Sequence, residues 1–214
     1  MLSAGEVSGL LAGDVIIEEK LDGANLGISI DADGSLLLQN RGQYLRQPFT
    51  AQFAKLEQWL AEHQDRIFDV LEPSMIVFGE WCAARHSVDY EKLPDWWILF
   101  DVYDRQHRNF WSTARRNDWA ARAGTACVAE VFRGRATMHS IQSRLNATVS
   151  AYRSGPPEGF VVRKEDSNWL VSRAKLVRSD FVRNMTIHWR RQALHWNRLA
   201  ASTQDAQSNL VRPD

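Results

Sequence analysis

The stretch Val15-Ile16-Ile17-Glu18-Glu19-Lys20-Leu21-Asp22-Gly23 says more about the fold and function of this chain than any other. Three apolar residues followed by charged ones predict a buried strand that ends near the lysine. Beside fixed charges at a strand end, an amine can lose its proton and act as a nucleophile. Taken alone, the tetrapeptide 20–23 favours a plain turn, because Asp and Gly supply the local hydrogen bond and the permissive backbone.

The composition is that of a folded protein. The 214 residues are 44% hydrophobic and 24% charged, enough for one substantial core and a small appendage. The two cysteines, Cys82 and Cys127, provide neither a disulfide framework nor a Cys/His metal cluster. No stretch approaches the roughly 18 to 20 apolar residues that span a bilayer, and the N-terminus lacks a leader pattern. We therefore expect a cytoplasmic protein with no membrane partner.

The formal net charge of zero conceals an uneven distribution of charge. Residues 1–130 hold 12 Lys and Arg against 20 Asp and Glu, a net charge of −8. Residues 131–214 hold 14 against 6, a net charge of +8. The C-terminal part is therefore expected either to bind a polyanion or to present a solvated, arginine-rich helix surface.

Hydrophobic periodicity predicts alternating strands and helices. Strands are expected at 15–19, 25–30, 35–39, 75–79, 96–103, 125–132, 160–163 and 169–173, with a hairpin turn at 31–34. Helices are expected after Thr50, at 112–123, at 137–145 and at 181–199. The last helix would interleave arginines with tryptophans, and residues 201–214 are expected to form a flexible tail.

Further segments downstream of Lys20 carry side chains suited to a nucleotide. Arg41, in Asn40-Arg41-Gly42, follows the strand hairpin and suits a phosphate or sugar contact. Glu80, in Phe78-Gly79-Glu80-Trp81-Cys82, stands at a strand end, where a carboxylate can accept hydrogen bonds from ribose hydroxyls. Phe100, in the apolar run 98–103, offers a ring on which a base could stack.

Two segments near the end of the pattern carry a carboxylate and several cations. Glu158-Gly159-Phe160-Val161-Val162-Arg163 pairs a carboxylate that could bind a metal with a cation. In Arg173-Ala174-Lys175 the period-2 spacing places both cations on one face of a strand, where they could grip a triphosphate.

In this order, the segments from about Glu18 to Lys175 resemble the adenylyltransferase domain of ATP-dependent RNA ligases, within the covalent nucleotidyltransferase superfamily of ligases and capping enzymes. The stretch from 78 to 101 is especially similar to the nick-sealing branch that includes phage and RNA-editing ligases. The resemblance implies an α+β nucleotidyltransferase (ATP-grasp-like ligase) domain of antiparallel sheets flanked by helices, with a C-terminal helical extension. It divides the chain into a catalytic domain at 1–176, an arginine-rich helix at 177–200 and a tail at 201–214.

The resemblance also implies a three-step reaction and a role for each residue. ATP, with Mg²⁺ or Mn²⁺, would adenylylate a lysine; AMP would pass to an RNA 5′-phosphate; and a 3′-hydroxyl would displace it, in RNA repair. The catalytic residues would be Lys20, Asp22 and Lys175. Ribose would contact Glu80, adenine would stack on Phe100, and Glu158 would bind the metal. The phosphate contacts would be Arg41, Arg163, Arg173 and Lys175, with Glu18 or Glu19 near the adenine or the metal.

Departures from the family pattern leave alternatives open. Arg173 and Arg163 stand where lysine is common, which preserves charge but removes a readily deprotonated amine. The 39 residues after Lys175 are too few for an appended nucleic-acid-binding domain. We therefore hypothesise that an RNA end-healing kinase or phosphatase, or another partner, helps this chain to engage RNA ends. The alternatives are a DNA ligase, a GTP-using capping enzyme and a degenerate nucleotide- or RNA-binding module. His86 is either an RNA contact or a structural residue.

Overall fold

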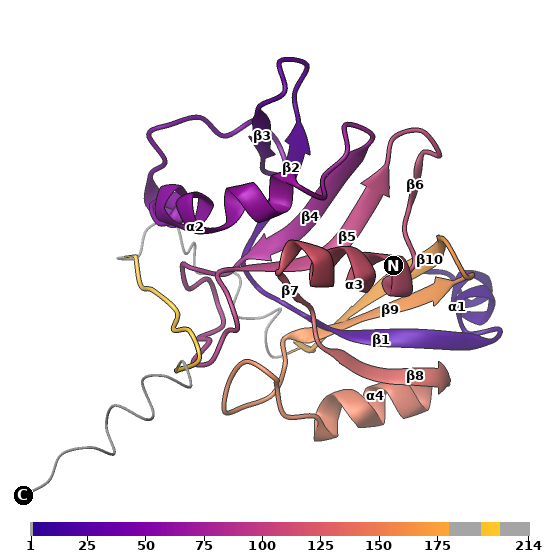
Figure 1. Cartoon of the computed structure of the whole chain (residues 1–214). Helices are drawn as coiled ribbons and strands as arrows, with labels where there is room; N and C mark the ends of the chain where they lie inside the picture. Colours follow the sequence, from indigo (N-terminus) through magenta and orange to yellow (C-terminus); the bar gives the residue numbers. More distant parts are fainter. Residues whose placement is uncertain (1, 180–193, 202–214) are drawn as a thin grey trace, which may run out of the picture.

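A computed structural model describes residues 2–179 and 194–201. Its lower sheet in Figure 1 has four antiparallel strands in the order β10-β9-β1-β8. These strands are β1 (Asp14–Lys20), β8 (Glu130–Arg135), β9 (Gly159–Glu165) and β10 (Leu170–Val177). The nucleophile candidate Lys20 is therefore the last residue of a strand in the middle of this sheet.

The upper sheet has six strands and begins directly after the Lys20 motif. Its antiparallel order is β3-β2-β4-β5-β6, and β7 adds to β5 in parallel. The strands are β2 (Ala24–Ile30), β3 (Leu36–Gln39), β4 (Met75–Trp81), β5 (Trp97–Asp104), β6 (Asn109–Phe110) and β7 (Ala126–Cys127). Only residues 21–23 join β1 of one sheet to β2 of the other.

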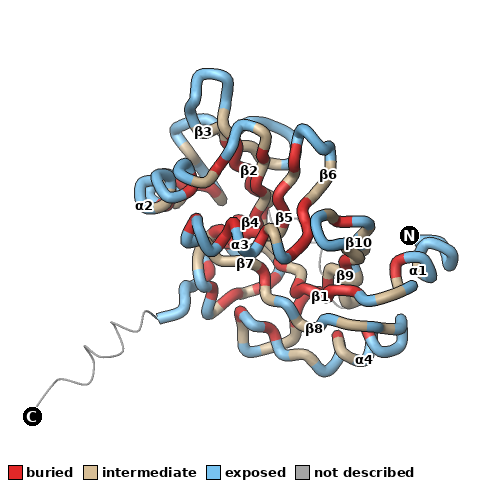
Figure 2. The backbone as a smooth tube through the Cα atoms, turned by 45° about the vertical axis from the view of Figure 1, so that its right-hand side comes forward, coloured by how far each residue is buried: buried red, intermediate tan, exposed pale blue. Residues whose placement is uncertain are grey.

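Each sheet is covered by its own helices. The helical elements are α1 (Ala4–Leu10), the 3-10 turn η1 (Ala51–Phe53), α2 (Leu56–Phe68), α3 (Thr113–Ala123) and α4 (Met138–Ala147). Trp59 of α2 and Trp119 of α3 enter the core of the upper sheet, and Leu145 of α4 enters that of the lower. Figure 2 shows this sorting, with buried residues along the strands and exposed ones on the outer sides of the helices.

The structure confirms the α+β class and most predicted elements, and corrects one strand. Residues 125–132 form two short strands, β7 and β8, which belong to different sheets. The change of sheet takes two residues: Val128 N donates to Leu99 O of the upper sheet at 3.0 Å, and Ala129 O accepts from Glu19 N of the lower sheet at 2.9 Å. Strand periodicity did not reveal the crossing, because it does not indicate which sheet provides the hydrogen-bond partners.

The predicted C-terminal helix is wrong for residues 194–199. They are extended, and Trp196 and Leu199 form isolated β-bridges with Ala84 and Leu93. A spacing of three between large apolar residues fits a helix, but here both side chains belong to a segment that lies along the loop 83–93. The rest of the predicted helix, at 180–193, and the tail at 202–214 lie outside the described residues.

His63 on α2 makes the stability of the upper sheet depend on pH. Its ring stacks on Trp59 at 4.5 Å. Its Nδ1 lies 2.8 Å from Trp59 O and its Nε2 3.2 Å from Asp95 Oδ2, so both nitrogens face acceptors. The hydrogen bond to Asp95 raises the pKa of His63. A raised folded-state pKa contributes stability that is complete below the unfolded value of about 6.5 and lost as pH rises through the folded value.

We therefore expect the melting temperature of His63→Phe to lie furthest below wild type at about pH 6 and to approach it as the pH rises. Thermal melts of both proteins across this range provide the measurement. His139→Phe, at an exposed histidine of α4, is the matched control. A pH-independent gap would contradict the assignment.

Candidate active site

A cavity of about 220 Å³ lies between the two sheets. Its walls come from both: from β1 and β9–β10 on one side and from β2, β4 and β5 on the other. Residues that line it are Glu18, Glu19, Lys20, Leu21, Asn25, Arg41, Glu80, Phe100, Asp101, Val128, Val161, Arg163, Arg173 and Lys175. The cavity thus collects nearly every residue that the sequence motifs single out, from segments up to 157 positions apart (18 to 175).

Lys20 lies at the cavity wall with a carboxylate as its polar side-chain partner. Antiparallel pairing of β1 with β9 sets Lys20 opposite Gly159, which brings the preceding Glu158 to its amine. Lys20 Nζ donates to Glu158 Oε2 at 2.6 Å and Oε1 at 2.8 Å, and to Leu21 O at 3.2 Å. Burial raises the pKa of Glu158. The amine is thereby held at the cavity next to a group that can take its proton.

Asp22 faces a different direction from Lys20. Its Oδ2 accepts from Ser87 N at 2.8 Å, Ser87 Oγ at 2.5 Å and Val88 N at 3.0 Å, and its own N donates to Tyr90 Oη at 2.7 Å. Asp22 is not among the lining residues. Its predicted catalytic role stays a prediction; the contacts themselves anchor the turn after Lys20 to the loop 83–93.

Gly23 is required by the close approach of β2 to β4. A Cβ at this position would lie 2.5 Å from Trp81 O, inside van der Waals contact with a backbone atom. The absence of a side chain also lets Gly23 N donate to Glu80 Oε1 at 2.9 Å. The tetrapeptide is therefore both a tight turn and part of the cavity wall.

The upper sheet contributes an acid, a ring and a cation to the cavity. Glu80 is the penultimate residue of β4, and burial raises its pKa to about 7. Phe100 of β5 is half-buried and lines the cavity. Arg41 stands in a turn held by Asn40 Oδ1, which accepts from Gly42 N and Gln43 N at 3.0 Å each.

The lower sheet contributes cations from β10. Arg173 and Lys175 share one face of this strand, as their period-2 spacing predicts, and both line the cavity. The guanidinium of Arg173 contacts Asp101 and lies 4.5 Å from the ring centroid of Phe110. Burial, and then the charge of Lys20, lower the pKa of Lys175. Lys20 and Lys175 thus face the same cavity as like charges.

Beneath the cavity lies a buried network of charges that the motifs predict only in part. Arg163 is 1% exposed and contacts Asp101 Oδ1 and Glu165 Oε1, both at 2.6 Å. Arg116 of α3 is equally buried; its Nη2 lies 2.6 Å from Glu18 Oε1, and its Nη1 donates to Phe100 O at 2.8 Å. The guanidinium of Arg163 is thus already engaged by two carboxylates. Its expected contact with a phosphate stays a prediction.

Arg116 was not predicted, although a signal existed. It occupies the same helix face as Trp119, Ala120 and Ala123, which are buried. An arginine on the apolar side of an amphipathic helix needs a buried carboxylate partner, because an unpaired buried charge is costly. That argument predicts a buried carboxylate partner but does not identify it as Glu18.

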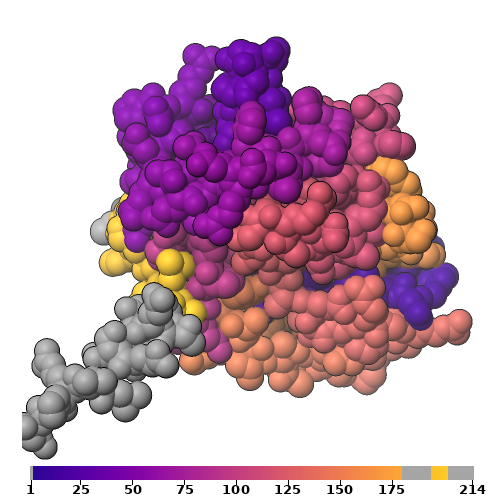
Figure 3. Space-filling model, viewed as in Figure 1, coloured from indigo at the N-terminus to yellow at the C-terminus, as the bar shows by residue number. Residues whose placement is uncertain are grey.

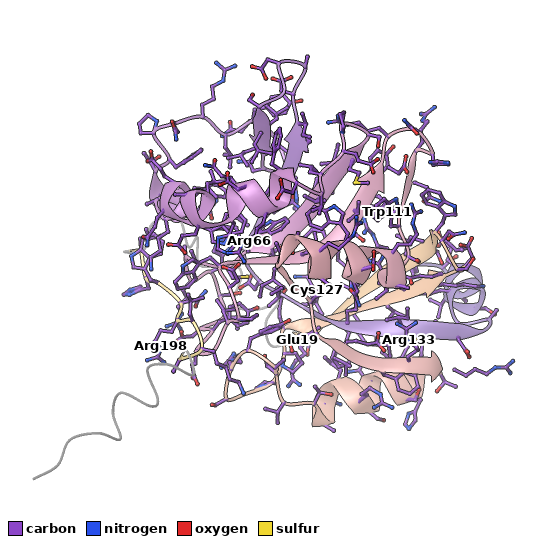
Figure 4. The ribbon with its side chains drawn as sticks, viewed as in Figure 1. Glu19, Arg66, Trp111, Cys127, Arg133 and Arg198 are labelled. Atoms are coloured by element: carbon purple, nitrogen blue, oxygen red, sulfur yellow. The ribbon has the colours of Figure 1, made fainter. Side chains whose placement is uncertain are left out.

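Glu18 and Glu19 lie on the same strand with different partners. Glu19 is 2% exposed, and its carboxylate accepts from Ser150 Oγ at 2.5 Å and Ala151 N at 2.9 Å. Glu18 Oε1 forms an ion pair with Arg116 Nη2 at 2.6 Å. In Figure 4, Glu19 lies near the centre of the molecule, and Arg133 lies further out along the lower sheet.

The donor set for a metal is small. Within residues 2–179 and 194–201, no group of three or more His, Cys, Asp and Glu side chains could hold an ion. Glu158, the predicted metal ligand, is not among the lining residues, but its carboxylate contacts Lys20 Nζ at the cavity wall. This donor set fits an ion such as Mg²⁺, which keeps several waters and binds through one or two carboxylates and substrate phosphates.

His86 does not line the cavity; its Nε2 lies 2.8 Å from Gln52 Oε1, and burial lowers its pKa.

In the part of the chain that the structure describes, no helix has the length and apolar character needed to cross a bilayer.

Two facing antiparallel sheets with a lysine at the mouth of an acid- and arginine-lined cavity define a nucleotidyltransferase-type domain. The chain belongs to the RNA ligase family, whose model matches residues 13–177. The match covers all of the strands and the whole cavity. No curated protein matches the sequence.

Solved structures share this fold at low sequence identity. An RNA ligase of Naegleria gruberi with pyrophosphate superposes with a TM-score of 0.65 at 17% identity, over 85% of this chain and 54% of that one. A lysine-to-alanine variant of the same enzyme with ATP and Mn gives 0.62 at 16%, over 84% and 54%. A glutamate-to-alanine variant with AMP and Mn gives 0.63 at 15%, over 84% and 54%. The chain therefore spans about half the length of these ligases.

Proposed function

We propose that this protein is an ATP-dependent RNA ligase that carries AMP on Lys20. The observation on which this rests is the position of Lys20 Nζ, at the wall of the cavity and 2.6 Å from Glu158. Membership of the RNA ligase family supports the reaction class. A lysine used only for packing would have no need of cations around it.

In the first step, Lys20 Nζ attacks the α-phosphorus of ATP. A nitrogen–phosphorus bond forms, the bond to the bridging oxygen of the β-phosphate breaks, and pyrophosphate leaves. Glu158, the carboxylate nearest to the amine, accepts the proton that Nζ loses. Arg41, Arg173 and Lys175 stabilise the departing charge, since phosphoryl-type transfer depends on positioning and charge neutralisation.

Glu18 favours adenine over guanine. Its carboxylate is buried at the cavity wall, where Oε1 forms an ion pair with Arg116 Nη2 at 2.6 Å. The exocyclic amino group of adenine can donate to such an oxygen, whereas guanine carries a carbonyl oxygen at the equivalent position. Phe100 provides the stacking surface on the opposite sheet, and Glu80 accepts from the ribose hydroxyls. The ATP and AMP complexes of the Naegleria enzyme support this choice of nucleotide.

Glu158 is the residue that would hold a divalent ion, together with nucleotide phosphate oxygens and water. The ion, when bound, neutralises part of the triphosphate charge. Mg²⁺ or Mn²⁺ suits these oxygen donors, and the Naegleria complexes contain Mn.

The later steps use RNA ends. AMP passes from Lys20 to an RNA 5′-phosphate, and a 3′-hydroxyl then attacks that phosphate, forms the phosphodiester and expels AMP. The chain spans about half of its ligase neighbours, so a further domain or an end-healing kinase or phosphatase supplying suitable ends fits the proposal. RNA repair in the cytoplasm is the corresponding setting.

The decisive experiment is incubation of the purified protein with Mg²⁺ and either ATP or GTP labelled at the α-phosphate. We expect ATP alone to leave label on the denatured polypeptide. Label from GTP would indicate a capping-type enzyme instead. No label from either, with a folded protein, would indicate a binding module. With adenylylated protein in hand, nicked or broken RNA and DNA substrates separate an RNA ligase from a DNA ligase.

Phe100→Ala should weaken ATP binding by about 1 to 3 kcal/mol, because it removes the stacking surface for adenine. Titration of the nucleotide into wild type and variant, followed by calorimetry, provides the measurement. Phe68→Ala, at an exposed ring on α2, is the control and should bind ATP normally. An unchanged affinity in the Phe100 variant would place that ring in the core alone.

A further inference from the structure

The C-terminal segment 194–200, here called the strap, lies along the loop 83–93 on the side of the molecule away from β10. Figure 3 shows its yellow atoms against the magenta and purple surface, and Arg198 marks it in Figure 4. Five backbone hydrogen bonds of 2.8 to 3.1 Å join strap and loop: Arg85 N to His195 O, Asn197 N to Ala83 O, Arg198 N to Tyr90 O, Leu93 N to Arg198 O and Ala200 N to Leu93 O. The strap thus adds a row of backbone hydrogen bonds along a loop that is otherwise irregular.

Asn197 is the strap residue that reaches into the loop. It is 3% exposed, the most buried residue of a segment that is otherwise exposed. Its Oδ1 accepts from Tyr90 N at 2.9 Å, and its Nδ2 donates to Cys82 O at 2.8 Å and Ala84 O at 3.3 Å. One side chain therefore ties both ends of the loop together.

The same loop holds the turn that follows Lys20. Tyr90 Oη accepts from Asp22 N, while Ser87 and Val88 donate to Asp22 Oδ2, all within 3.0 Å. Leu21 packs with Val88 and Tyr90 in one buried cluster, and Leu21 O accepts from Lys20 Nζ. A short chain of contacts leads from Asn197 through Tyr90 and Asp22 to the nucleophile.

We propose that Asn197 is a positioning residue for Lys20, acting through Tyr90 and Asp22. The inference rests on the proposed function, because its consequence is the rate of lysyl-adenylate formation. Asn197 lies outside the residues 13–177 matched by the family model, so the strap is a contribution of this chain's own C-terminal part. The role follows from geometry: a nucleophile displaced by about 1 Å can react a hundredfold more slowly.

The test is a double-mutant cycle in the full-length chain with Asn197→Ala and Tyr90→Phe. At saturating ATP, each variant should label roughly tenfold more slowly than wild type, with the ATP concentration for half-maximal rate unchanged. The double variant should be no slower than the slower single variant, because both substitutions interrupt one path. Independent effects would multiply to about a hundredfold and would overturn the proposal.

Leu145→Ala is the matched control for lost stability. Leu145 is fully buried under the lower sheet, outside the cavity and the strap. This variant should melt at a lower temperature yet label at the wild-type rate when assayed below its transition. If Leu145→Ala slows labelling as much as Asn197→Ala does, general destabilisation explains both, and the proposal fails.

Hydrogen exchange separates failure of this inference from failure of the proposed function. The amides of Ser87 and Val88 should exchange faster in Asn197→Ala than in wild type and Leu145→Ala, whether or not any nucleotide is transferred. A wild-type protein that takes no label overturns the proposed function and, with it, the kinetic role of Asn197. Normal labelling of wild type with equal rates or equal exchange in Asn197→Ala overturns the positioning role alone.

Discussion

Lys20→Ala leaves no detectable label on the protein after incubation with α-labelled ATP, whereas wild type retains it. The expected loss is complete, because no other amine of the cavity stands in the same place: Lys175 enters from β10, two strands away from β1. Removing the amine leaves Glu158 buried without its partner. That carboxyl already has a raised pKa and can take up a proton, so the fold should persist.

Lys164→Ala is the matched control for Lys20→Ala. Lys164 lies on the neighbouring strand β9, and its Nζ donates to Gly9 O at 2.8 Å, away from the cavity. This variant should label like wild type. Circular dichroism melts of both variants establish that they are folded. Label on Lys20→Ala at the wild-type level would remove Lys20 from the mechanism.

Arg163→Met destabilises the protein by about 3 to 5 kcal/mol, the cost of removing one partner from a buried ion pair. Arg163 contacts Asp101, which is 1% exposed, and Glu165, whose carboxylate also caps α3 by accepting from Thr113 N and Oγ1 at 2.8 Å each. Methionine fills part of the volume but leaves Glu165 without its arginine partner and Asp101 with Arg173 alone. Urea unfolding, analysed by midpoint and slope, measures the loss.

Arg133→Met controls for the removal of an arginine. Arg133 pairs with Glu130 at 2.7 Å on β8, and its side chain is 53% exposed. Such pairs contribute about 0 to 1 kcal/mol, so this variant should unfold close to wild type. Equal midpoints for the Arg163 variant and wild type would mean that the buried network does not hold the sheets together, and that Arg163 is free for phosphate.

The sequence predicted the residues of the cavity better than it predicted the connections around it. Motif spacing identified nine of the cavity-lining residues because each carries a charge or a ring within one of the motif segments. The sequence did not predict that the chain changes sheets at Val128 and Ala129. A strand pattern indicates that residues are buried, but it does not indicate which sheet provides their hydrogen-bond partners. The roles of the lining residues remain predictions until the labelling and binding experiments are done.

Two structural errors have a common cause. Residues 194–199 show apolar residues three apart, which favours a helix when only local spacing is considered. Their hydrogen bonds instead go to a loop more than a hundred positions earlier, and no local signal records that pairing. Arg116 was missed for the same reason, since its importance depends on Glu18, which lies on a distant strand.

The two short crossings between the sheets, 21–23 and 128–129, lie side by side, because Leu21 and Val128 pack in one cluster. Buried ion pairs join the same two halves of the molecule: Arg116 of α3 with Glu18 of β1, and Arg163 of β9 with Asp101 of β5. Lys20, the last residue of β1, therefore stands beside backbone links and buried ion pairs that fix it relative to both sheets. A nucleotide that enters the cavity would meet its nucleophile already in place.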